Sequence, residues 1–127
     1  MLAMNAAESR RVLCDSLYAT AHSMYEAEPL RAISLFQLLA KLRPTDERGW
    51  LGTGACHEAV DADDVALSIY TFGQGAARSA RCVAARARLL LKLGRACDAT
   101  DAVEYALTLS WSDDDTELLE RERERLP

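Results

Sequence analysis

The residues best suited to chemistry in this chain are its two histidines and four cysteines. A thiol beside an imidazole can act as a nucleophilic pair, and both groups bind transition metals. His22, His57, Cys14 and Cys56 lack ligand spacing, however, and adjacent Cys56 and His57 point to different faces of a helix. We find no CxxC pair, paired carboxylate or oxyanion device. The sequence therefore predicts no enzyme, no metal site and no cofactor, and each cysteine is expected to be a small buried hydrophobe.

Two short motifs imitate ligand-binding loops. Gly52–Gly54 has the spacing of a phosphate loop, but the third glycine of that pattern falls at His57 and no strand precedes it. Asp61–Asp64 resembles the start of a calcium loop, which requires glycine at its sixth position and glutamate at its twelfth. Those positions hold Ala66 and Phe72. We expect the first motif inside a helix and the second in a helix-capping turn.

Composition excludes several classes of function. The net charge of -5 argues against a general nucleic-acid binder, which needs a basic face. The sequence holds no run of about 20 apolar residues, so no direct membrane insertion is expected. The apolar start Met1–Ala7 is too short for a signal peptide, and Arg10 and Arg11 follow it instead of preceding it. We expect a cytoplasmic globular protein.

One local concentration of positive charge stands against this acidic background. It allows two interpretations, a solvated helix face or a basic rim that faces an acidic or polar peptide. The residues are Arg78, Arg81, Arg86, Arg88, Lys92 and Arg95.

The elements that must position these residues follow from an internal repeat. Ala32 and Ala66 are 34 residues apart, Ala66 and Ala99 are 33 apart, and each begins a similar apolar run. Trp50 precedes Ala66 by 16 residues and is followed by a glycine-rich segment. A period near 34 with tryptophan, glycine and alanine in these positions is typical of the tetratricopeptide repeat.

Capping residues, apolar periodicity and prolines then divide the chain into helices. We predict an all-α fold of three tetratricopeptide-type hairpins in a right-handed superhelix plus a C-terminal capping helix. It forms a single domain 1–127, with repeats at about 14–44, 47–79 and 80–111 and the capping helix at 112–127. The expected helices cover about 5–27, 29–44, 46–60, 63–74, 80–93, 96–109 and 116–126.

In such an array the first helix of each pair lines a concave groove. Tyrosines there offer an apolar body with a polar tip, and alanines leave pockets between them. An alternative is that the tyrosines are ordinary core aromatics. Repeat positions predict a peptide groove formed by Tyr18, His22, Tyr25, Arg48, Leu51, Ala55, Glu58, Ala59, Arg81, Ala84, Arg88 and Leu91.

The residues within the repeats resemble a known family, the translocator chaperones of bacterial type III secretion. The likeness extends over about residues 17–109, and the Leu-Gly-x-Gly-Ala-Cys segment of the second repeat is its most specific part. It rests on Leu17–Ala21 with Tyr25, Ala32–Phe36, Trp50–Cys56, Ala66–Tyr70 with Gly73, and Leu90–Leu91 with Gly94 and Ala99.

This resemblance implies a cytoplasmic chaperone that binds an extended segment of a translocator in its concave groove and keeps the translocator soluble and secretion-competent. It implies Tyr18 and Tyr25 as the leading contacts. Two alternatives are a chaperone of a needle or effector subunit, whose segment binds as a helix, and a general adaptor scaffold. The sequence is compatible with a monomer or a homodimer.

Overall fold

A computed structural model describes residues 3–127, which fold into seven helices and contain no strand. Met1 and Leu2, which belong to the predicted domain 1–127 and to the apolar start, lie outside the described residues. The helices are α1 (Ala6–Met24), α2 (Pro29–Leu42), α3 (Glu47–Ala59), α4 (Asp63–Ala76), α5 (Ala80–Lys92), α6 (Ala96–Leu107) and α7 (Asp113–Arg125). The predicted all-α fold is confirmed.

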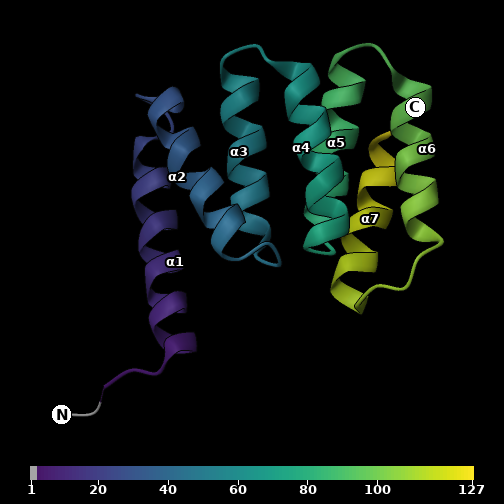
Figure 1. Ribbon diagram of the computed structural model, residues 1–127. Helices are drawn as coiled ribbons and strands as arrows, with labels where there is room; N and C mark the ends of the chain where they lie inside the picture. The colour runs from purple at the N-terminus through teal and green to yellow at the C-terminus, as the bar shows by residue number, and fades with distance from the viewer. Residues whose placement is uncertain (1–2) are drawn as a thin grey trace.

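The helices form three consecutive antiparallel hairpins, α1–α2, α3–α4 and α5–α6, with α7 packed on the last one (Figure 1). The first helices of the hairpins contact one another, α1 with α3 and α3 with α5, and α7 continues this row on α5. Among the described residues, α2 does not contact α4, and α4 does not contact α6. The array therefore curves toward the row of first helices, which makes that side concave.

Four of the helices begin with a side-chain cap. The carbonyl oxygen of the Asn5 side chain accepts from the backbone N–H of Glu8, and Asp46, Ser79 and Ser112 cap α3, α5 and α7 in the same way. Such a cap satisfies one of the free N–H groups at a helix start. The predicted cap of α4 by Asp63 or Asp64 is wrong, because α4 begins at Asp63 and Ala62 holds the cap position without a side-chain hydrogen bond.

Small residues set the distance between neighbouring helices. Ala32, Ala66 and Ala99 are fully buried, as their positions in the repeat predicted. At Gly49, α3 packs directly against the backbone of α2, because an added Cβ would lie 2.7 Å from the backbone nitrogen of Ala40.

The expectation that every cysteine is buried is also wrong in one case. Cys14, Cys56 and Cys82 are buried, whereas Cys97 is exposed. Cys97 is the second residue of α6, and its neighbour Ala96 is only partly covered. The first turn of this outer helix therefore leaves the thiol in solvent.

Helix α7 closes the C-terminal end of the core. Leu119 is fully buried against the α5–α6 hairpin, while most of the charged residues of α7 are exposed. A final repeat needs a cover of this kind, apolar on one side and polar on the other. Within residues 3–127, no helix is both long and apolar enough to cross a membrane.

Candidate functional site

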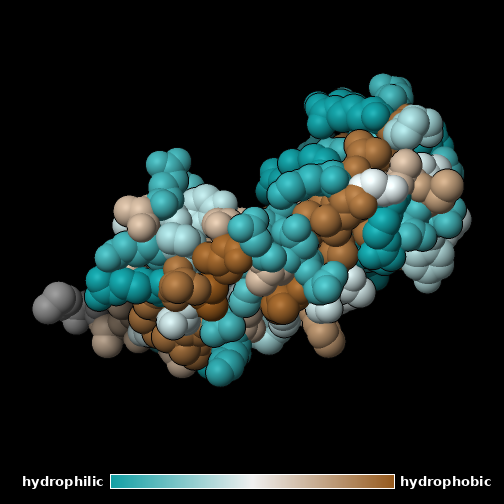
Figure 2. All heavy atoms as spheres, turned by 90° about the horizontal axis from the view of Figure 1, so that it is seen from above, coloured by the Kyte–Doolittle hydropathy of each residue, from teal (hydrophilic) through white to brown (hydrophobic). Residues whose placement is uncertain are grey.

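A pocket of about 350 Å³ lies on the concave side, between α1, α3 and the first turn of α5, with Phe36 from the middle of α2 in its wall. Its wall combines aromatic rings, small residues and three charged side chains. The lining residues are Tyr18, His22, Tyr25, Phe36, Glu47, Arg48, Leu51, Gly52, Ala55 and Arg81. Seen from above, the molecule is hollowed on one side between its two ends, and hydrophobic atoms are exposed among polar ones (Figure 2).

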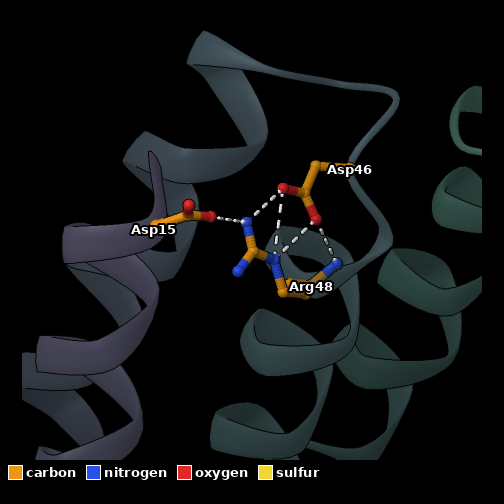
Figure 3. Close-up of polar contacts among 3 residues, drawn as sticks. All are labelled: Asp15, Asp46 and Arg48. Carbon is orange, nitrogen blue, oxygen red and sulfur yellow. Dashed lines mark hydrogen bonds and ion pairs between the residues drawn. The ribbon is translucent and has the colours of Figure 1, made fainter. Parts of the chain in front are cut away.

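Arg48, in the first turn of α3, fixes one edge of the pocket (Figure 3). Its guanidinium donates to the Asp46 carboxylate at 2.7 and 3.0 Å and to Asp15 of α1 at 2.9 Å. Hydrogen bonds from Arg48 lower the pKa of Asp46, and those to Asp46 raise the pKa of Arg48. Because Asp15 and Asp46 belong to different segments, Arg48 joins α1 to the start of α3.

The same arginine holds the aromatic wall in place. Its guanidinium carbon lies 4.8 Å from the centre of the Tyr18 ring, a cation–π distance. The Tyr18 ring lies 5.5 Å from His22 and 6.3 Å from Phe36, measured between ring centres. Tyr18 is thus an aromatic surface that is supported on three sides and half open to the pocket.

Tyr25 forms the opposite corner, just after the last turn of α1. Its hydroxyl donates a hydrogen bond to the Ala55 carbonyl at 3.4 Å, and burial raises its pKa. Because Ala55 is small, this part of the pocket stays open beside the ring. Tyr18 and Tyr25 pack against the buried cluster around Phe36 on one side, and each keeps part of its surface open to the pocket on the other.

The floor of the pocket depends on a close approach between α2 and α3. Phe36 is buried, and its ring lies directly over Gly52. A Cβ added at Gly52 would lie 2.2 Å from a carbon of that ring, so any larger residue would displace it. Glycine at this position lets the aromatic ring become the base of a binding surface.

A third edge comes from α5. Glu47 accepts hydrogen bonds from the Ser79 hydroxyl at 2.8 Å and from Arg81 at 3.1 Å. Ser79 is also the N-cap of α5, so this carboxylate joins the start of α3 to the start of α5. Both pocket arginines therefore already have carboxylate partners, and the remaining free surface is aromatic, aliphatic and backbone.

The buried ionisable groups near the pocket are poorly suited to catalysis. Burial raises the pKa of the Cys56 thiol to about 11, so the thiolate is scarce at neutral pH. Burial also raises the pKa of Tyr70, which donates its proton in a hydrogen bond to Glu58. Among the described residues, no group of three His, Cys, Asp or Glu side chains could hold a metal ion. The arrangement is suited to binding.

The pocket contains seven of the twelve residues predicted for the groove. The prediction is wrong for Ala84, which is 1 % exposed and packs within the core instead of leaving an open pocket. Arg88 is exposed but pairs with Glu122 of α7 at 3.5 Å, so the capping helix occupies its surroundings. Glu58, Ala59 and Leu91 lie outside this pocket.

Three lining residues, Phe36, Glu47 and Gly52, were not predicted as groove residues. Only the close approach of α2 and α3 places Phe36 and Gly52 at the pocket. Glu47 follows a helix cap, where an acidic residue is favourable for the helix alone. The position of Gly52 between tryptophan and a second glycine was the only available signal of a close approach.

The structure is that of a helical-repeat protein with a pocket on its concave side. No protein-family model and no curated protein matches the chain. Several solved structures, in contrast, are similar to the chain. The type III secretion translocator chaperone SycD of Yersinia enterocolitica is 28 % identical, with a TM-score of 0.73 over 89 % of this chain and 87 % of SycD.

SycD in complex with a peptide of the translocator YopD is similar at 26 % identity and a TM-score of 0.67, over 87 % of this chain and 89 % of that one. PcrH of Pseudomonas aeruginosa shares the fold, with a TM-score of 0.69 and 23 % identity over 97 % of this chain and 94 % of PcrH. The structural neighbours of this chain are thus translocator chaperones, which confirms the resemblance found in its repeats.

Proposed function

We propose that the chain is a chaperone of a bacterial type III secretion system that binds an extended segment of a translocator in its concave pocket. The observation that carries this proposal is the partly open pair Tyr18 and Tyr25 in a pocket whose charges are already paired. Such a surface takes up apolar side chains and offers few unsatisfied charges. The SycD structure with a translocator peptide supports the same class of client.

The physical task is to cover apolar segments of a client before secretion. Exposed apolar stretches of a membrane-active protein favour aggregation. A partner that binds them reduces their free concentration by mass action and needs no catalytic group. Binding of this kind takes place in the cytoplasm, where the client is made.

The test compares a double tyrosine substitution with a control in a chaperone co-expressed with the translocator subunits of its own secretion system. Tyr18→Ala with Tyr25→Ala should weaken the complex about 500-fold or more, because central aromatic anchors each contribute roughly 2 kcal/mol or more and every 1.4 kcal/mol is tenfold in affinity. Leu30→Ala removes an exposed large side chain from α2, outside the pocket, and should leave the affinity unchanged. Circular dichroism confirms that each variant is folded.

Equal affinities of the Tyr18→Ala/Tyr25→Ala protein and the wild type would refute the groove assignment. A needle or effector subunit that binds more tightly than either translocator would favour the second candidate client. The amphipathic helix of such a client would contact the pocket through residues three and four apart, whereas an extended segment would contact it through every second residue. Cross-linking from Leu51, which lines the middle of the pocket, distinguishes these two patterns.

A further inference from the structure

A second groove lies on the outer side of the array, away from the concave pocket. It exists because α4 and α6 do not contact each other, so that part of α5 is open between them. Two adjoining cavities of about 280 and 550 Å³ share Thr71 and Arg86 and form this outer groove. Its lining is Leu67, Ser68, Thr71, Phe72, Gln74, Gly75, Arg78, Arg86, Leu90, Arg95, Tyr105, Leu109, Ser110 and Trp111.

The charged side chains that line this groove are all positive. Arg78, Arg86 and Arg95 line it, and no aspartate or glutamate does. Arg86 makes no ion pair within residues 3–127, and Arg78 donates only to the Ser110 carbonyl at 2.8 Å. Arg95 pairs with Asp98 at 2.8 Å, an exposed pair that is readily exchanged. In a chain of net charge -5, this concentration of positive charge is local.

Large apolar side chains border the same arginines without being packed. Phe72 on α4 is 67 % exposed and Tyr105 on α6 is 63 % exposed, and the exposed Leu109 lines the same cavity as Tyr105. The guanidinium carbon of Arg78 lies 5.9 Å from the centre of the Trp111 ring at one end of the groove. Because both side chains are mostly exposed, neither Phe72 nor Tyr105 fills the core, and both rings are open to a partner.

The basic cluster of the sequence is thereby divided between two surfaces. Arg81 and Arg88 face carboxylates of this chain, Glu47 and Glu122, on the concave side. Arg78, Arg86 and Arg95 face outward into the groove between α4 and α6. The first set is neutralised internally, whereas the second set still has capacity for carboxylates of a partner.

We propose that the outer groove is a second docking site, which binds an acidic protein segment that carries a large apolar side chain. Guanidinium groups pair with carboxylates in two-point hydrogen bonds, and an exposed aromatic ring packs against an aliphatic or aromatic side chain of a partner. Nucleic acid fits less well, because a long polyanion would be repelled by a chain whose net charge is -5, whereas a short segment with few carboxylates meets mainly the local arginines. This site is independent of the proposed client pocket.

The experiment measures fluorescence anisotropy of a labelled synthetic peptide in which glutamates flank two leucines and a phenylalanine. A second peptide has glutamine in place of every glutamate. The full chain should bind the glutamate peptide more tightly, with affinity that falls as salt rises. Arg86→Gln with Arg95→Gln should weaken binding about fivefold, from the loss of two exposed ion pairs. Phe72→Ser, at a side chain exposed in the free protein, should weaken it about tenfold.

Arg121→Gln with Arg123→Gln is the matched control, since it removes two exposed arginines from α7, outside the groove. It should leave binding unchanged. The proposal is overturned if both arginine pairs have equal effects, if the glutamine peptide binds equally well, or if a short DNA duplex or phosphatidylglycerol vesicles compete more strongly through Arg86. The Tyr18→Ala/Tyr25→Ala protein should bind the glutamate peptide normally, which separates this site from the concave pocket.

Discussion

Gly49 provides a sharp test of how α2 and α3 are packed. It lies in the first turns of α3 and is buried against α2. The Cβ of Gly49→Ala would stand 2.7 Å from the backbone nitrogen of Ala40 and 2.9 Å from its Cα. Because these are backbone atoms, no side-chain rotation relieves the clash.

The magnitude follows from two opposing effects. Ordinary contact begins at about 3.4 Å, so α3 must move away from α2 by about 0.7 Å (3.4 minus 2.7). Overpacking of this kind costs about 1–3 kcal/mol. Alanine in a helix gains about 0.5–1 kcal/mol over glycine. We expect Gly49→Ala to lower the free energy of unfolding by about 1–2 kcal/mol and to loosen the floor of the pocket.

Gly75→Ala is the control, because nothing lies within 4 Å of the Cβ that it would add on α4. It should be neutral or stabilising by up to about 1 kcal/mol. Urea unfolding followed by circular dichroism gives both values from the shift of the midpoint at constant slope. If Gly49→Ala is as stable as Gly75→Ala, the argument that Gly49 sets the distance between α2 and α3 is refuted.

Three further predictions concern the ion pairs, the thiols and the capping helix. Arg48→Met should destabilise by about 1–3 kcal/mol at neutral pH, because Asp46 is left as a nearly buried, unpaired carboxylate. The pKa of Asp46 is lowered in the folded protein, so its stabilisation is present above about pH 4 and is lost as the pH falls further. The difference in urea midpoint from the wild type should therefore shrink in acid, and a constant difference would contradict the pairing. Cys97 should be the one thiol that reacts rapidly with Ellman's reagent in the native protein, since the other three are buried; fast modification of more than one would contradict the described burial. Leu119→Ala should cost about 2–5 kcal/mol in urea unfolding, because it empties a fully buried site under α7, and a loss below 1 kcal/mol would show that α7 is dispensable for the core.

Much of the fold could be predicted because it depends on local signals. The spacing of Ala32, Ala66 and Ala99 indicated the hairpins, and each of these residues is buried where the repeat requires it. Gly94 follows α5 with a φ of +78°, the left-handed conformation that glycine favours after a helix. Asn5 and Ser112 cap the helices that follow them, as their types indicated. The caps and the glycine turn are decided within a few residues, and the repeat is a spacing along the chain, so the sequence alone suffices for both.

The candidate site was less predictable because its parts come from different helices. Periodicity placed Tyr18 and Arg48 on the concave side, but nothing in the sequence indicated that Asp15 would join Asp46 in binding Arg48. The same limit explains the error at Ala84. A position on the concave face of a regular repeat becomes buried when the neighbouring helices close over it.

By itself, the sequence determined seven helices, their pairing into hairpins and the likeness to the translocator chaperones, because repeat spacing and capping act along the chain. Only the tertiary structure decided which side chains meet in the concave pocket, which arginines are neutralised internally, and that Phe72 and Tyr105 border an outer groove. These properties depend on distances between helices. Such distances are set by the packing of small residues such as Gly49 and Gly52 against another helix, which no local pattern records.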